Sequence, residues 1–158
     1  MRLAAGTFDM KLAVKSGAII PVLLMLPNLA WMLFYSLDAG AKSDVPVALS
    51  AAENVARSAA LVLPFFHSLN KKGVWSTVVW AGMAGALAVY YLAWGRFFMG
   101  DGSAALLSAP LMGIPAPLAL SPVALLLLAS YLMNSWWMFS AALAFGVFHV
   151  WALSLISL

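Results

Sequence analysis

Five long apolar stretches, separated by short polar segments, run through the chain. They cover residues 16–37, 46–68, 74–94, 116–133 and 136–158. Each is close to the length that an α-helix needs to cross the hydrocarbon core of a bilayer, which is about 20 residues. The pattern predicts an all-α protein, with a single membrane domain over residues 1–158 that forms a bundle of about five transmembrane helices.

Polar and helix-breaking residues mark the ends of these stretches and interrupt two of them. The polar segment 70–73 and the pair Asn134-Ser135 predict the turns before the third and fifth helices. Pro27 and Pro64 lie inside the first and second stretches. Each proline lacks the backbone donor of a helix, so the carbonyl oxygen four residues earlier is expected to lose its helical partner.

The composition excludes an ordinary soluble domain. Hydrophobic residues make up 65% of the 158 residues and charged residues only 8%, whereas about a quarter of a soluble protein is charged. The chain has no Cys, so it can form neither disulfides nor thiolate metal sites. The net charge of +3 is small, and we expect lysine and arginine at membrane edges rather than a basic surface for nucleic acid.

The positions of lysine and arginine predict how the chain is oriented. Arg2, Lys11 and Lys15 precede the first stretch, and Lys71 and Lys72 follow the second. Positive residues favour the cytoplasmic side, which predicts a multi-pass protein of a bacterial inner membrane with a cytoplasmic N-terminus and an outer C-terminus. The turn between the fourth and fifth stretches carries no positive charge. A four-span protein with a bent or re-entrant last region therefore remains an alternative.

Aromatic and small residues predict further features of the third stretch. Tyr90, Tyr91 and Trp94 fall near its outer end, where an interfacial aromatic belt is expected. Gly82 and Gly85 each belong to a pair of small residues four positions apart. Such pairs let helices approach closely in membranes, so we expect another helix to pack on this face.

Glu53 and Arg57 lie near the middle of the second stretch. Their spacing puts them on one helical face, roughly 40° apart, and ionisable groups at such a depth mark a site by default. Counting residues from the helix ends places Asn28 and His149 in the same layer near the midplane. One interpretation is a wet polar site between the first, second and fifth helices. The other is a satisfied Glu–Arg ion pair with Asn28 and His149 as interhelical hydrogen-bond partners.

No cofactor, metal site or catalytic residue is predicted. His67 lies near the inner boundary and His149 near the midplane, a difference of roughly 13–18 Å in depth, which argues against one haem ligated by both. With no Cys and a single Glu, the chain lacks the ligands of a complete zinc site. The sequence contains no acyl-transfer motif, Gly-rich phosphate loop or HExxH.

These observations favour a non-enzymatic accessory or scaffold component of the membrane, one that holds a protein partner, a lipid or an apolar ligand. The alternative is a small transporter that works as an oligomer, with its polar midplane site at Glu53 and Arg57. A lipid-modifying enzyme would have only Glu53, Arg57 and His149 to supply its chemistry. Membrane lipids, a second copy of the chain or a membrane protein complex are the expected partners, and nucleic acid is not.

Overall fold

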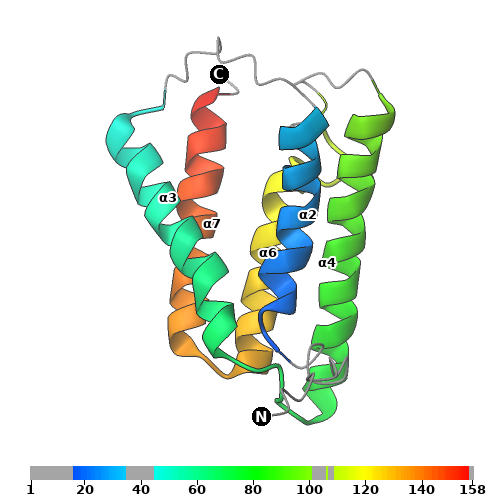
Figure 1. Ribbon diagram of the computed structural model, residues 1–158, viewed down its shortest axis with the longest axis vertical. Coiled ribbons are helices and arrows are strands. Elements are labelled where there is room, and N and C mark those ends of the chain that lie inside the picture. The colour runs from blue at the N-terminus through cyan, green and yellow to red at the C-terminus, as the bar shows by residue number, and fades with distance from the viewer. Residues whose placement is uncertain (1–15, 35–44, 101–105, 107–108, 157–158) are drawn as a thin grey trace, which may run out of the picture.

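The structure is a computed structural model that describes residues 16–34, 45–100, 106 and 109–156, and most of these residues are helical. The elements are α2 (Ile19–Phe34), α3 (Val47–Val62), the 3-10 turn η1 (Leu63–Phe66), α4 (Val74–Met99), α6 (Pro117–Met133) and α7 (Trp136–Ile156). The described helices run alternately up and down, so α2 begins and α7 ends at opposite ends of the bundle (Figure 1). The prediction of an all-α helical bundle is confirmed.

The bounds of the helices differ from the predicted stretches in three places. α2 occupies the middle of the first stretch, and the residues that follow Phe34 lie outside the described part. α3 ends at Val62, where the 3-10 turn η1 follows with Pro64 near its start, and His67 after this turn has an extended backbone. α4 continues through Gly95 to Met99, five residues beyond the predicted end, and Gly100 follows its last residue.

The turn between α6 and α7 forms as predicted at Asn134-Ser135. Asn134 has a left-handed backbone with φ of 49°, which asparagine tolerates better than most residues. Its N–H donates to the Tyr131 carbonyl at 3.1 Å, and the Ser135 N–H donates to the Ser130 carbonyl at 3.2 Å, the pattern of a Schellman motif. The Ser135 hydroxyl then accepts from the Met138 N–H at 3.2 Å and caps α7.

The tightest helix packing lies between α4 and α6, between α6 and α7, and between α3 and α7. A Cβ added at Gly146 on α7 would lie 2.6 Å from Cγ1 of Val123 on α6, so the absence of a side chain permits this approach. A Cβ at Gly82 would lie 3.1 Å from Leu128 of α6, but one at Gly85 would meet nothing within 4 Å. The predicted close-approach face is therefore wrong at Gly85, because that face of α4 turns away from the bundle.

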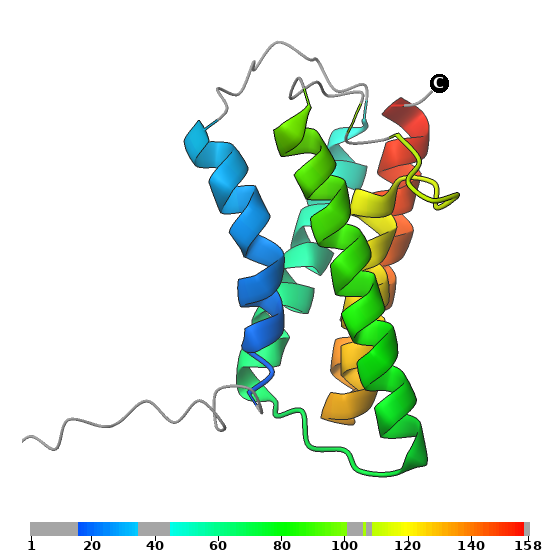
Figure 2. The ribbon, with the colours of Figure 1, turned by 90° about the vertical axis from the view of Figure 1, so that its right-hand side faces the viewer.

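α2 makes the fewest contacts with the other helices, and it lies at one side of the bundle (Figure 2). Its lower end is held by Gly17, whose N–H donates to the His67 carbonyl at 2.9 Å. A Cβ at Gly17 would lie 2.8 Å from that carbonyl oxygen and nearer still to the one of Pro64. Only glycine fits between α2 and the segment after α3.

Two of the described helices are long and apolar enough to cross a membrane, α4 and the segment Trp136–Leu155 of α7. α2 and α6 are apolar but shorter, with 16 and 17 residues. Large apolar side chains are exposed along the whole bundle; they include Leu33, Phe34, Val47, Phe66, Val74, Met99, Trp136 and Trp137, each at least 76% exposed. The bundle thus presents an apolar surface on its outside as well as in its core.

Candidate ligand-binding site

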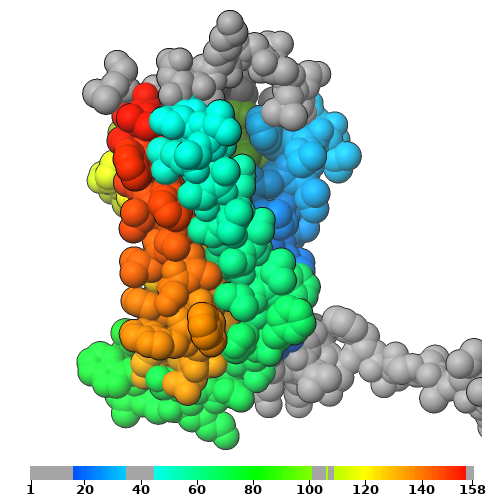
Figure 3. All heavy atoms as spheres, turned by 90° about the vertical axis from the view of Figure 1, so that its left-hand side faces the viewer, coloured from blue at the N-terminus to red at the C-terminus, as the bar shows by residue number. Residues whose placement is uncertain are grey.

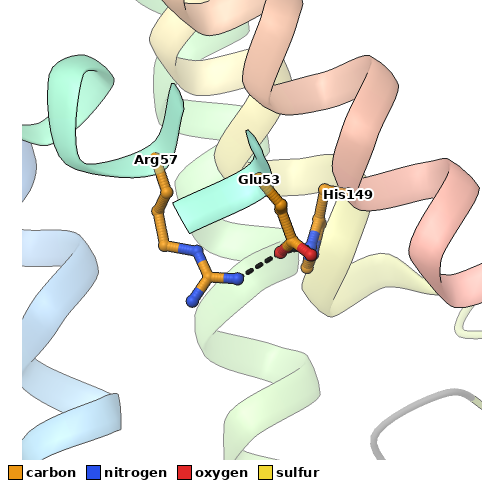
Figure 4. Close-up of polar contacts among 3 residues, drawn as sticks. All are labelled: Glu53, Arg57 and His149. Carbon is orange, nitrogen blue, oxygen red and sulfur yellow. Dashed lines mark hydrogen bonds and ion pairs between the residues drawn. The ribbon is translucent and has the colours of Figure 1, made fainter. Parts of the chain in front are cut away.

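Glu53 joins α3 to α7 through one carboxylate oxygen. His149 of α7 approaches it with Nδ1 at 2.7 Å from Oε1, and Arg57, one turn along α3, forms an ion pair with the same Oε1 (Figure 4). An ionised carboxylate can only accept hydrogen bonds. Therefore Nδ1 of His149 carries a proton in this arrangement, and Nε2 is the nitrogen that remains for another partner.

The buried face of α3 determines that Glu53 points at α7. Leu49, Glu53, Ala56 and Ala60 are the buried residues of α3, and their spacing of three or four places them on one side of the helix. Ala56 and Ala60 are 8% and 0% exposed, and their small side chains let α7 pack closely against this side. The carboxylate of Glu53 is thereby enclosed between the two helices.

Phe145 completes the cluster from α7, one turn before His149. Its ring stacks on the imidazole with centroids 5.0 Å apart, and the guanidinium of Arg57 lies 5.7 Å from its centroid, within cation–π range. The side chain of Glu53 is only 10% exposed, whereas that of Arg57 is 42% exposed. Arg57 is therefore paired with Glu53 and still accessible to other groups.

Next to this cluster lies a cavity of about 320 Å³ that all five described helices and the residue preceding α6 line. The lining residues are Leu24, Met25, Asn28, Trp31, Arg57, Leu61, Tyr90, Trp94, Ala116, Leu118, Ala119, Pro122, Leu126, Phe145, His149 and Leu153. Most are aliphatic or aromatic, and a few are polar, which is the usual make-up of a small-molecule site. The volume is at the lower end of the range for such sites.

Asn28 lines the cavity from α2 and has hydrogen-bond partners of its own. Its Nδ2 donates to the Leu24 carbonyl and to the Tyr90 hydroxyl, both at 2.8 Å, and the Tyr90 hydroxyl donates to the same carbonyl at 2.9 Å. Tyr90 is 3% exposed, so its predicted place in an interfacial belt is wrong. The side chain points inward from α4 and binds α2.

Tyr91 satisfies the carbonyl that Pro27 leaves unpaired. Because Pro27 has no N–H, the Leu23 carbonyl loses its helical donor, as predicted from the sequence. The Tyr91 hydroxyl donates to that oxygen at 2.9 Å. Tyr90 and Tyr91 together attach the middle of α2 to α4, next to the cavity.

The structure thus brings Glu53, Arg57 and His149 into direct contact, and it places Asn28 on the wall of the adjoining cavity. Sequence reasoning missed the aromatic walls, which Trp31, Tyr90, Trp94 and Phe145 provide. One signal was available, since Phe145 precedes His149 by four positions and shares its helical face. The walls from Trp31 and Trp94 depend on how α2 lies against α4, which the pattern does not reveal.

The remaining histidine lies away from this site. Nδ1 of His67 is 2.8 Å from the Leu63 carbonyl, and the His67 carbonyl accepts from the N–H of Gly17, just before α2 begins. Within residues 16–34, 45–100, 106 and 109–156, no three His, Asp or Glu side chains gather in a group that could hold a metal ion.

No protein-family model, curated protein or solved structure matches this chain. The fold and the site together define an all-helical bundle with an apolar cavity, beside which a carboxylate, a guanidinium and an imidazole form one cluster.

Proposed function

We propose that the chain is an integral membrane protein with five passes, in a bacterial-type inner membrane. The many large apolar side chains that the bundle exposes support this, because monomeric soluble proteins rarely expose large apolar patches. The up-and-down course of the five helices also fits five crossings (Figure 1). In water this surface would favour aggregation, whereas in a bilayer it would face lipid chains.

The shorter helices need an explanation in this proposal. α2, with 16 residues, is about 24 Å long, which is less than the hydrocarbon thickness of about 30 Å. Local thinning of the bilayer can accommodate short spans at a modest free-energy cost. η1 extends the length of α3 in the same direction.

The charges support a cytoplasmic location for the end at which α4 begins. Lys71 and Lys72 lie there, and Lys71 Nζ is 3.7 Å from the Tyr131 ring centroid. At the other end, Arg96 donates to the carbonyls of Leu106, Ala109 and Pro110 at 3.1, 2.7 and 2.9 Å. The guanidinium of Arg96 is therefore hydrogen-bonded to carbonyl groups of the chain itself. The leader with Arg2, Lys11 and Lys15 lies outside the described residues.

Within this membrane bundle, the cavity of about 320 Å³ carries the functional proposal. We infer that the protein is a non-enzymatic component that binds a small, largely apolar ligand, such as a membrane lipid or a fragment of one. Apolar walls provide the contact area, and a few polar groups at one side would orient the ligand.

The ligand would reach the cavity sideways, from the bilayer. α2 and α3 do not pack tightly against each other, and the space-filling view shows a hollow between their upper parts (Figure 3). Tyr90 and Tyr91 of α4 donate hydrogen bonds that hold α2. A lipid chain could pass between α2 and α3 without breaking those hydrogen bonds.

The same opening supports the second candidate, a small transporter that works as an oligomer. A loosely packed α2 could alternate between two positions beside the Glu53–Arg57–His149 cluster. Reconstitution into vesicles would separate the two candidates. A binding component retains its ligand without moving it across the membrane, whereas a transporter produces a measurable flux.

Native mass spectrometry of the purified protein tests the proposal. We expect the protein released from nanodiscs to retain non-protein mass of one ligand per chain. Ala119 lines the cavity and is 5% exposed, so Ala119→Phe should fill the space and abolish retention. Ala88→Phe makes the same change on the exposed side of α4 and serves as the matched control. Equal retention by both variants would contradict the proposal.

A further inference from the structure

We propose that the ligand of this cavity is a single-chain amphiphile with a carboxylate headgroup, which pairs with Arg57 beside His149. The inference rests on the proposed function and specifies its ligand class. Arg57 lines the cavity, whereas its neighbour Glu53 is enclosed between α3 and α7.

Arg57 can bind a second carboxylate without releasing the first. A guanidinium has five N–H donors in a planar fork, and Nη2 is the atom that contacts Glu53 Oε1. The side chain remains 42% exposed, so the other donors can reach a ligand in the cavity. A carboxylate matches this fork because its two oxygens can accept two parallel N–H bonds.

His149 provides the second contact. Glu53 holds the proton on Nδ1, so in the neutral ring Nε2 is an acceptor, and His149 lines the same cavity as Arg57. A carboxylic acid can donate its proton there: its O–H bond breaks, an Nε2–H bond forms, and the carboxylate pairs with the imidazolium and the guanidinium.

This proton transfer keeps the cluster neutral, which matters in an apolar environment. Before binding, Glu53 carries one negative charge and Arg57 one positive charge. After binding, the ligand carboxylate and the imidazolium of His149 add one charge of each sign. An unpaired charge in such an environment is costly. An acid that enters in its neutral form, and whose binding gives a cluster with no net charge, is therefore favoured over an ammonium amphiphile, which Arg57 would repel.

The cavity also has apolar walls that suit an alkyl chain. Leu118, Leu126 and Leu153 line it together with Trp94. Trp94 Nε1 is a buried donor without a hydrogen-bond partner among the described residues. The cavity wall carries the charged guanidinium of Arg57 and the imidazole of His149, which can recognise an acidic headgroup, and Asn28 adds an amide.

The test compares three amphiphiles with one chain length, dodecanoic acid, dodecanol and dodecylamine, added at equal mole fraction to nanodiscs that contain the full-length protein. The readouts are the shift in melting temperature and the bound mass in native mass spectrometry. We expect the acid to bind at least about tenfold more tightly than the alcohol, as is typical when a charged hydrogen-bonding partner is lost. The amine should bind least.

Arg57→Lys keeps the charge and the ion pair with Glu53 but removes the planar fork, so it should weaken binding of the acid and leave the alcohol unchanged. The paired variant Glu53→Gln/Arg57→Gln leaves no unpaired charge and should abolish the preference for the acid. Equal binding of acid and alcohol, unchanged by Arg57→Lys, would overturn the carboxylate inference and leave an apolar binding site. Absence of binding by all three amphiphiles would contradict the proposed function itself.

Discussion

Glu53 and His149 are 96 positions apart in the chain, yet Nδ1 of His149 lies 2.7 Å from Oε1 of Glu53. This contact makes the predicted Glu–Arg pair into a cluster of three groups from two helices. It also explains how a carboxylate can be enclosed between α3 and α7, because two donors converge on the same oxygen. The stability of the cluster should therefore depend on all its members.

A double-mutant cycle measures this dependence. Glu53→Gln and Arg57→Gln each leave a charge without its partner, and we expect each to lower the free energy of unfolding by about 1–3 kcal/mol. This expected loss of stability is smaller than for a fully buried ion pair, because the Arg57 side chain is 42% exposed. The double variant should recover part of the loss. Denaturant titration in detergent micelles gives the coupling, and strict additivity would show that the two groups are not partners.

A second cycle tests the attachment of α2 to α4. Tyr91→Phe removes the donor to the Leu23 carbonyl and should lower the free energy of unfolding by about 1 kcal/mol, the typical net contribution of one hydrogen bond. Pro27→Ala restores a backbone N–H that can reach the same carbonyl. In that background Tyr91→Phe should have a smaller effect. If the effect is the same in both backgrounds, Tyr91 does not serve the oxygen that Pro27 leaves unpaired.

Two glycine substitutions distinguish close packing from open surface. Gly17→Ala should destabilise the protein and separate α2 from η1, since the added methyl would lie 2.8 Å from the backbone oxygen of His67. Gly85→Ala is the matched control, because nothing lies within 4 Å of the new methyl. It should stabilise α4 by up to about 1 kcal/mol through helix propensity. Thermal melting should show that Gly17→Ala is less stable than Gly85→Ala, and an equal loss of stability in both variants would contradict this prediction.

The proposed orientation can be tested because the chain has no native Cys. Met112 is 83% exposed in the segment before α6, and Lys72 lies at the opposite end of the bundle. In intact cells, an impermeant thiol reagent should label Met112→Cys and leave Lys72→Cys unlabelled until the membrane is opened. Labelling of Lys72→Cys alone would invert the orientation. Labelling of both would show that they do not lie on opposite sides of a membrane.

Much of the fold could be predicted because local chemistry decides it. Asn134 and Ser135 terminate α6 and cap α7 through their own side chains and backbone, so the turn was visible in the sequence. Pro64 was correctly predicted to disturb α3, but the 3-10 turn that contains it was not predicted. Gly85 and Gly146 show the opposite case. The sequence pattern predicted a close helix approach at Gly85, but the structure has a close approach at Gly146.

The candidate site was predictable only in its polar part, Asn28, Glu53, Arg57 and His149. Glu53 and Arg57 stand out because ionisable residues are rare in apolar helices, and counting along the helices placed His149 near them. The position of Tyr90 was not predictable in this way. An aromatic residue near a helix end fits an interfacial belt equally well, and only the rotation of α4 turns Tyr90 inward toward Leu24.

The central claim, that the cavity beside Arg57 binds an amphiphile inside a membrane bundle, is tested most directly by locating a heavy atom. Crystals grown in lipid with ω-brominated dodecanoic acid should give an anomalous bromine peak inside the cavity, among Leu118, Leu126 and Leu153, with the carboxylate at Arg57. A bromine peak found only on the outer apolar surface, with the cavity closed by movement of α2, would contradict the claim.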